Sequence, residues 1–128
     1  MNNPPSVLVV DDEPLIGLLV ADWLGELGYG VVGPVGQAGE AMAHLDRDAA
    51  DAVLLDVSLG AGDSFQLADK AREKGLALAF ITGRSALDLP QRFQGVPVLA
   101  KPFDFAAMET LMGSLLNGSP SVRAQSDT

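Results

Sequence analysis

The sequence predicts an α/β fold in which helices cover both faces of a parallel β-sheet. Short β-branched and aliphatic runs, which are typical of strands, recur at residues 6–10, 30–35, 52–55, 77–81 and 96–100. Between them lie segments whose apolar residues recur every three or four positions, a spacing that is typical of helices. Strands that alternate with helices favour a doubly wound parallel sheet. With five strand–helix units, we expect the flavodoxin-like strand order 2-1-3-4-5.

The first predicted helix covers residues 13–27. Pro14 suits its first turn, and Gly28 suits a position just past its end. Seven apolar residues at the helical spacing form a stripe that we expect to face the core. They are Leu15, Ile16, Leu19, Val20, Trp23, Leu24 and Leu27.

Three further helices are expected at residues 37–46, 64–74 and 105–116, each with apolar side chains on one face. Residues 85–93 are the fourth helical region in chain order, but they contain Pro90. Proline removes a backbone donor and breaks a helix interior, so we expect a short or irregular element there.

Length and composition fit one small domain at residues 1–117, followed by a polar, disordered tail at 118–128. The chain has 128 residues, of which 48% are hydrophobic, which is enough for a single core. It has no apolar run that could span a bilayer and no leader-like start, so a cytoplasmic location is expected. A net charge of −9 disfavours nucleic-acid binding, and the absence of cysteine excludes disulfides and thiol catalysis.

Polar residues able to do chemistry follow four of the predicted strands. Asp11 and Asp12 come after the first strand, Asp56 after the third, Thr82 after the fourth and Lys101 after the fifth. The carboxyl ends of parallel strands line one crevice, where ligands bind. We therefore expect these five side chains to converge.

This set of side chains suits a divalent cation and a phosphoryl group. Neighbouring carboxylates resist joint ionisation unless a cation neutralises them, and Mg²⁺ prefers carboxylate and phosphate oxygens. An aspartate beside such a cation can act as a nucleophile toward phosphorus. Lys101 can supply a positive charge, and Thr82 can donate a hydrogen bond to a phosphoryl oxygen.

Each of these residues also has a simpler interpretation. Asp12 alone could cap the first helix, because an aspartate at a helix start accepts backbone hydrogen bonds. Thr82 could be a strand-end or turn residue, and Lys101 could be an ordinary solvated lysine. Helix capping and metal binding by Asp12 are compatible with each other.

From residue 6 to about residue 117, the chain resembles the receiver domain of bacterial two-component response regulators. The Val-Asp-Asp-Glu run at 10–13 matches the acidic metal pocket of that family, and Leu55-Asp56 matches its phosphoacceptor strand end. Thr82 matches its hydroxyl position, and the Lys-Pro-Phe run at 101–103 matches its lysine–proline signature. Together, in this order and at strand ends, these motifs are highly specific.

The resemblance implies a role for each matched residue. Asp56 is the implied phosphoacceptor, with Lys101 and Thr82 in contact with the phosphoryl group. Asp11, Asp12 and Asp56, together with the backbone carbonyl of Ser58, are the implied Mg²⁺ ligands, and Asp12 is the more direct of the first two. Receivers often have a cis peptide bond at the lysine–proline step, and the resemblance extends this expectation to residues 101–102.

Residues 80–83, Phe-Ile-Thr-Gly, resemble the Phe-Ala-Thr-Gly-type motif of stand-alone alphaproteobacterial receivers, several of which work in general stress signalling. One departure concerns the switch, because Val98 stands where most receivers have tyrosine or phenylalanine. The usual coupling of threonine motion to an aromatic rotamer is therefore not expected in its familiar form.

The implied function is that of a single-domain response regulator. A histidine kinase or phosphotransfer protein would phosphorylate Asp56, which would then switch affinity for a downstream protein partner or pass the phosphate on. Such a protein is not an enzyme beyond self-catalysed phosphotransfer and dephosphorylation. We expect a monomer or weak dimer, no nucleic-acid or membrane partner, and a partner face with Leu87, Leu89 and Phe93 exposed.

Two alternatives remain on the sequence alone. The first is a phosphorylation-independent protein-interaction module that keeps the fold without the chemistry, although the complete set of acids, hydroxyl and lysine argues against it. The second is a Mg²⁺-dependent phosphatase with an aspartyl nucleophile. Its usual motif of two aspartates one residue apart is absent.

Overall fold

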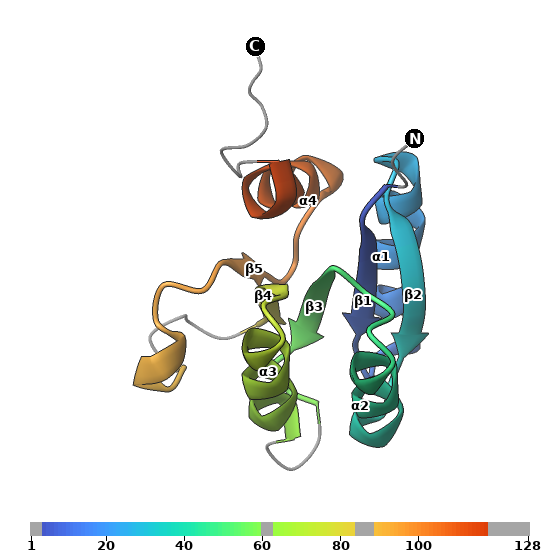
Figure 1. Ribbon diagram of the computed structural model, residues 1–128. Coiled ribbons are helices and arrows are strands. Elements are labelled where there is room, and N and C mark those ends of the chain that lie inside the picture. The colour runs from blue at the N-terminus through green and yellow to red at the C-terminus, as the bar shows by residue number, and fades with distance from the viewer. Residues whose placement is uncertain (1–3, 60–62, 84–88, 118–128) are drawn as a thin grey trace.

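The computed structural model describes residues 4–59, 63–83 and 89–117, and its sheet has the predicted order and direction (Figure 1). Five parallel strands lie in the order β2-β1-β3-β4-β5. They are β1 (Ser6–Val10), β2 (Gly30–Val35), β3 (Ala52–Asp56), β4 (Ala77–Thr82) and β5 (Val98–Ala100). The predicted flavodoxin-like fold is therefore confirmed.

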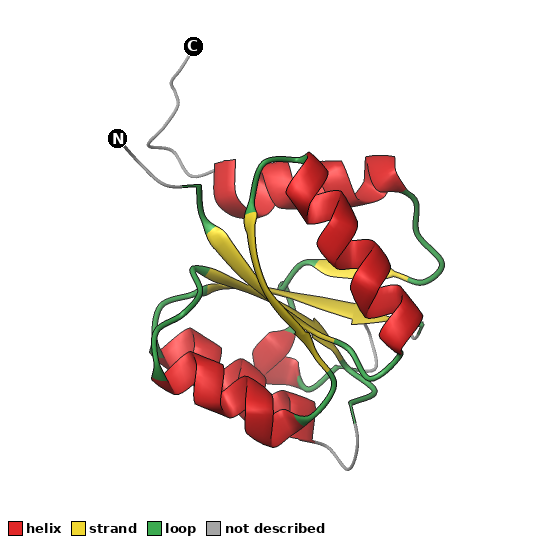
Figure 2. Ribbon diagram, turned by 90° about the vertical axis from the view of Figure 1, so that its right-hand side faces the viewer, coloured by secondary structure: helices red, strands yellow, loops and turns green. Residues whose placement is uncertain are grey.

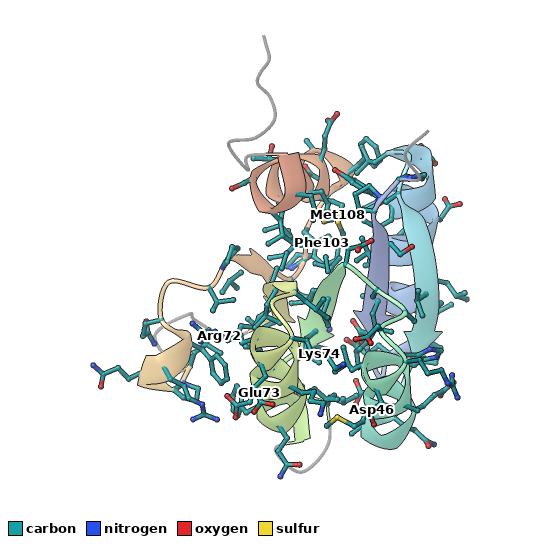
Figure 3. The ribbon with its side chains drawn as sticks, in the orientation of Figure 1. Asp46, Arg72, Glu73, Lys74, Phe103 and Met108 are labelled. Carbon is teal, nitrogen blue, oxygen red and sulfur yellow. The ribbon has the colours of Figure 1, made fainter. Side chains whose placement is uncertain are left out.

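Helices cover both faces of this sheet and divide the core into two clusters (Figure 2). One cluster lies under α1 (Pro14–Glu26) and α4 (Phe105–Met112), and the other lies under α2 (Ala38–Asp46) and α3 (Asp63–Glu73). Side chains of β3 alternate between them, since Leu54 belongs to the first cluster and Leu55 to the second. Figure 3 shows Met108 of α4 pointing toward the sheet, where it is fully buried.

The C-terminal helix agrees with the sequence prediction. α4 continues without a break into the π-helical turn η3 (Gly113–Asn117), so the two together cover the predicted residues 105–116. Asp104 caps α4, because its side chain accepts a hydrogen bond from the backbone N–H of Ala107. The predicted tail at 118–128 lies outside the described residues.

The predicted core-facing stripe of the first helix is partly wrong. Leu15 is 81% exposed and Leu19 is 39% exposed. Val20 and Leu24 of the stripe are buried as predicted, and Gly17 is the third buried residue of α1. A Cβ added at Gly17 would lie 3.0 Å from the Pro34 Cβ, so this glycine lets the helix approach β2 closely and turns the two leucines outward.

The region predicted as a short or irregular fourth helix contains a single 3₁₀ turn among its described residues, η2 (Gln91–Phe93). Leu89 is 7% exposed and Phe93 is fully buried, so the prediction that they are exposed is wrong. Phe93 packs against the rings of Phe65 and Phe80, with centroid separations of 5.6 and 5.4 Å. These contacts hold η2 against the core, whereas Leu87 lies outside the described residues.

A bulge between β1 and β2 shapes the strand end that leads to the acidic residues. The register shifts between Leu8 and Val10, opposite Gly33, which has φ +94°. A Cβ at Gly33 would lie 2.8 Å from the Val35 backbone nitrogen, so the position requires glycine. Beyond the bulge, the Asp11 N–H donates to the Val35 carbonyl at 3.0 Å, which fixes the start of the loop after β1.

No described helix is long and apolar enough to cross a membrane.

Candidate functional site

Four of the predicted residues lie at one edge of the sheet. Asp11 directly follows β1, Asp56 ends β3, Thr82 ends β4 and Lys101 directly follows β5. The strands are parallel, so these positions meet at their carboxyl ends. The Lys101 N–H donates to the Thr82 carbonyl at 2.9 Å, which extends the β4–β5 pairing into the site.

Three carboxylates form the centre of the site. Asp11, Asp12 and Asp56 each offer an oxygen, and these oxygens all lie within 4.8 Å of one another. Asp11 and Asp56 are 3% and 1% exposed, whereas Asp12 is open to solvent. The site therefore combines two buried acids with one acid at its mouth.

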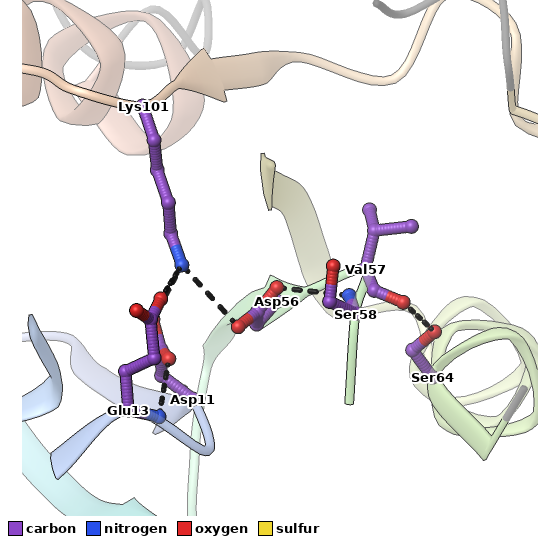
Figure 4. Close-up of polar contacts among 7 residues, drawn as sticks. All are labelled: Asp11, Glu13, Asp56, Val57, Ser58, Ser64 and Lys101. Carbon is purple, nitrogen blue, oxygen red and sulfur yellow. Dashed lines mark hydrogen bonds and ion pairs between the residues drawn. The ribbon is translucent and has the colours of Figure 1, made fainter. Parts of the chain in front are cut away.

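Backbone donors orient the two buried carboxylates (Figure 4). Asp11 Oδ1 accepts a hydrogen bond from the Glu13 N–H, and Asp56 Oδ1 accepts one from the Ser58 N–H, both at 2.9 Å. The second oxygen of each carboxylate faces the Lys101 ammonium. Lys101 Nζ lies 3.4 Å from Asp56 Oδ2 and 3.6 Å from Asp11 Oδ2.

Glu13 is a further partner of Lys101, with which it forms a hydrogen-bonded ion pair at the rim of the site. Burial alone would lower the pKa of Lys101. The hydrogen bond to Glu13 and the charges of Asp56 and Asp11 outweigh burial and raise that pKa above 10.5, so the lysine is charged. The interpretation of Lys101 as an ordinary solvated lysine is wrong, since its side chain is 19% exposed and contacts three acids.

Burial raises the pKa of Asp11 from 3.8 to about 6. The Glu13 N–H lowers this pKa, the neighbouring Asp56 raises it, and the Lys101 charge lowers it, but burial is the largest influence. The fold therefore holds a carboxylate that ionises reluctantly unless more positive charge is supplied.

The pocket fits a divalent cation. Among the described residues, no hydrogen-bond donor reaches Asp11 Oδ2, a buried oxygen whose neighbouring positive charge is the Lys101 ammonium at 3.6 Å. A buried carboxylate oxygen with an open lone pair is a position that a cation can fill. The candidate metal ligands are all carboxylate oxygens, and the exposed Asp12 leaves room for the waters that Mg²⁺ retains.

The remaining predictions concern Thr82, the Lys101–Pro102 peptide bond, Ser58 and Asp12. Thr82 is 1% exposed at the end of β4, and the Lys101–Pro102 peptide bond is cis, as the resemblance implied. Ser58 is exposed and uses its N–H to orient Asp56, while the role of its carbonyl stays a prediction. Asp12 is not the N-cap of α1, because Glu13 occupies that position, and the Glu13 side chain makes no capping hydrogen bond.

Two residues of this region were given no role from the sequence. Glu13 directly follows Asp11 and Asp12 in the run at 10–13, and this closeness to the end of the first strand was a signal that it would lie near the site. Ser64 is fully buried in α3 and donates its hydroxyl to the Val57 carbonyl at 2.9 Å, which ties the residue directly after Asp56 to this helix. No sequence signal marked Ser64, because its partner is a backbone atom.

Comparison with known proteins places the chain in a family. Residues 7–112 match the family model described as the response regulator receiver domain. The chain is 32% identical over 107 residues to the transcriptional regulatory protein PdtaR of Mycobacterium tuberculosis, and 31% identical over 125 residues to the response regulator Rre1 of Synechocystis. The PdtaR match covers 80% of the chain, and the Rre1 match covers 91% of it. The chain spans about half the length of these relatives, 52% of PdtaR and 53% of Rre1.

The fold is also similar to solved receiver structures. SdrG from Sphingomonas melonis aligns with a TM-score of 0.78 and 33% identity, over 91% of this chain and 99% of that one. The receiver domain of PhyR from Erythrobacter litoralis aligns with a TM-score of 0.80 over 94% and 95% of the two chains, at 24% identity. Receiver domains are signalling modules that bind Mg²⁺ at an acidic pocket and interact with histidine kinases or phosphotransfer proteins and with downstream partners. By its sequence match and its strand order, this chain belongs to the receiver domain family of two-component response regulators.

Proposed function

We propose that Asp56 accepts a phosphoryl group and that this modification switches the affinity of the domain for a protein partner. One observation carries the proposal: Asp56 has one oxygen held by the Ser58 N–H while the other faces the Lys101 ammonium at 3.4 Å. The carboxylate is thus oriented, nearly buried at 1% exposure, and adjacent to a positive charge. These are features of an activated nucleophile.

The chemical step is the transfer of phosphorus to a carboxylate oxygen. Asp56 Oδ2 attacks the phosphorus of a donor such as acetyl phosphate and forms a new O–P bond. The bond from phosphorus to the donor oxygen breaks, and acetate leaves with the electron pair. Attack by water on the same phosphorus later releases inorganic phosphate and restores the carboxylate.

Charges around Asp56 would stabilise this transfer. Mg²⁺, held by the carboxylates of Asp11, Asp12 and Asp56 and by the Ser58 carbonyl, would neutralise charge on the phosphoryl oxygens. The Lys101 ammonium lies close enough to Asp56 Oδ2 that it would form an ion pair with an oxygen of a phosphoryl group attached there. Thr82, at the end of the neighbouring strand, would donate its hydroxyl to another.

The known relatives support a switch of this kind. SdrG, at 33% identity, has been solved in a BeF3-activated conformation, and a PhyR protein at 25% identity is described as a stress response regulator. We infer that the phosphodonor of this chain is a histidine kinase or a phosphotransfer protein and that its output is binding to a downstream protein. Such a modification acts by shifting an equilibrium between two conformations.

Intact mass spectrometry after incubation with acetyl phosphate tests the proposal. We expect wild type to gain one phosphoryl group when Mg²⁺ is present and to gain none in EDTA. Asp56→Asn should gain none, while Asp22→Asn, a matched change at an exposed position of α1, should behave as wild type. A gain that persists in Asp56→Asn would contradict the proposal. No gain in any protein would favour the phosphorylation-independent interaction module.

A further inference from the structure

We propose that Glu13 is a positioning residue that holds the Lys101 ammonium at the rim of the pocket until a phosphoryl group on Asp56 takes the place of Glu13 as its partner. The proposal deepens, and rests on, the phosphoacceptor function proposed above. It concerns the one acid of the site that has neither an implied metal role nor an implied phosphoryl role.

The geometry shows a lysine shared unequally among three acids. Lys101 forms its closest contact with Glu13, while its distances to Asp56 Oδ2 and Asp11 Oδ2 are 3.4 and 3.6 Å (Figure 4). The ammonium is therefore drawn outward from the position between the two buried carboxylates. Among the described residues, Lys101 is the one polar partner of the Glu13 side chain.

The two partners differ in how firmly the fold holds them. The Lys101 side chain is 19% exposed, and its backbone is paired to Thr82. The Glu13 side chain is 58% exposed, and its backbone N–H is bound to Asp11 Oδ1. The Glu13 backbone is thus held in place, while its carboxylate can move into solvent. These are the properties of an ion-pair partner that a phosphoryl group could replace.

A phosphoryl group on Asp56 would compete for the same ammonium. It carries about two negative charges, against one on Glu13. The resting ion pair draws the ammonium toward Glu13 and so competes with the contact between Lys101 and the phosphoryl oxygens, which means that Glu13 opposes the formation of that contact. An exposed ion pair of this kind changes an equilibrium or rate by roughly two- to five-fold.

Removal of the contact should therefore accelerate phosphorylation. At saturating Mg²⁺, we expect Glu13→Gln to raise the rate of phosphorylation by acetyl phosphate by roughly two- to five-fold. Glu13→Asp keeps the charge but shortens the side chain, so it should lose the contact and show the same increase. Glu26→Gln removes a charge from the far end of α1 and should leave the rate unchanged.

A second readout follows the ammonium directly and needs no phosphodonor. The chain has three lysines, Lys70, Lys74 and Lys101, so a sample labelled with ¹³C at lysine Cε gives three resonances. We expect the Lys101 resonance of the metal-free protein to move in Glu13→Gln and Glu13→Asp and to stay in place in Glu26→Gln. Because Glu13→Asp keeps the charge, a shift of the Lys101 resonance in both Glu13 variants reports the loss of the contact and not the loss of the charge alone.

Two results would overturn the proposal. The first is Glu13→Asp behaving as wild type while Glu13→Gln is faster, because the effect would then belong to charge alone. The second is an unmoved Lys101 resonance in Glu13→Gln, which would show that the contact does not form in solution. If wild type accepted no phosphoryl group, the function proposed for Asp56 would fail, whereas the resonance comparison would still test the contact.

Discussion

At the scale of single residues, the Asp11 carboxylate is held in an environment that opposes its ionisation. Its side chain is buried, one oxygen has no hydrogen-bond donor among the described residues, and its pKa is raised from 3.8 to about 6. Between these two pH values, the folded protein binds a proton that the unfolded chain releases. The contribution of Asp11 to stability is therefore most favourable below pH 3.8 and is lost as pH rises through 6.

We predict that Asp11→Asn stabilises the metal-free protein at pH 7. A pKa shift of two units corresponds to about 3 kcal/mol, so the substitution should raise the free energy of unfolding by up to that amount. The advantage over wild type should shrink as pH falls from about 6 toward 3.8. Urea unfolding in EDTA across this pH range measures the difference.

Addition of Mg²⁺ provides the control for Asp11. A bound cation stabilises the folded state by mass action, and it requires the ionised carboxylate. Mg²⁺ should therefore raise the unfolding midpoint of wild type more than that of Asp11→Asn. An equal response of the two proteins to Mg²⁺, or a wild type that is the more stable in EDTA, would contradict this account of the site.

At the scale of elements, the approach of α1 to β2 depends on Gly17. An alanine Cβ there would meet the Pro34 Cβ at 3.0 Å, whereas one at Gly25 of the same helix has no heavy atom within 4 Å. Alanine in a helix interior is favoured over glycine by about 0.5–1 kcal/mol. The two glycines thus offer the same substitution with and without a steric conflict.

We predict opposite outcomes for these two substitutions. Gly25→Ala should raise the free energy of unfolding by up to about 1 kcal/mol, because it gains helix propensity without a clash. Gly17→Ala should lower it, because the Pro34 ring is part of β2 and α1 must move outward. Thermal unfolding of both variants measures the signs, and a stabilising Gly17→Ala would show that the helix is not tightly packed there.

At the scale of the whole molecule, periodicity was sufficient to predict the sheet and most of the helices. The five strands carry apolar runs, and their alternation with helices favoured a parallel doubly wound sheet, for which the expected order 2-1-3-4-5 is the one observed. The stripe on α1 was mispredicted at Leu15 and Leu19 because helix rotation depends on the contact of Gly17 with Pro34, which is distant in sequence. The burial of Phe93 was missed for a similar reason, since it depends on the rings of Phe65 and Phe80.

The same distinction applies to the candidate site. The positions of Asp11, Asp56 and Lys101 could be predicted because strand ends of a parallel sheet converge whatever the side-chain details. The contact between Glu13 and Lys101 could not, because it depends on the rotamers of two long side chains. The assignment of Asp56 as phosphoacceptor, with Thr82 and Lys101 as its contacts, stays a prediction that chemistry has to test.

Mapping the phosphoryl group by borohydride reduction tests the central claim most directly. Borohydride reduces an aspartyl phosphate to homoserine and leaves free carboxylates intact. After treatment with acetyl phosphate and Mg²⁺, peptide mass spectrometry should find homoserine at position 56 and unmodified aspartate at Asp11 and Asp12. Homoserine at Asp11 or Asp12, with Asp56 unmodified, would contradict the account.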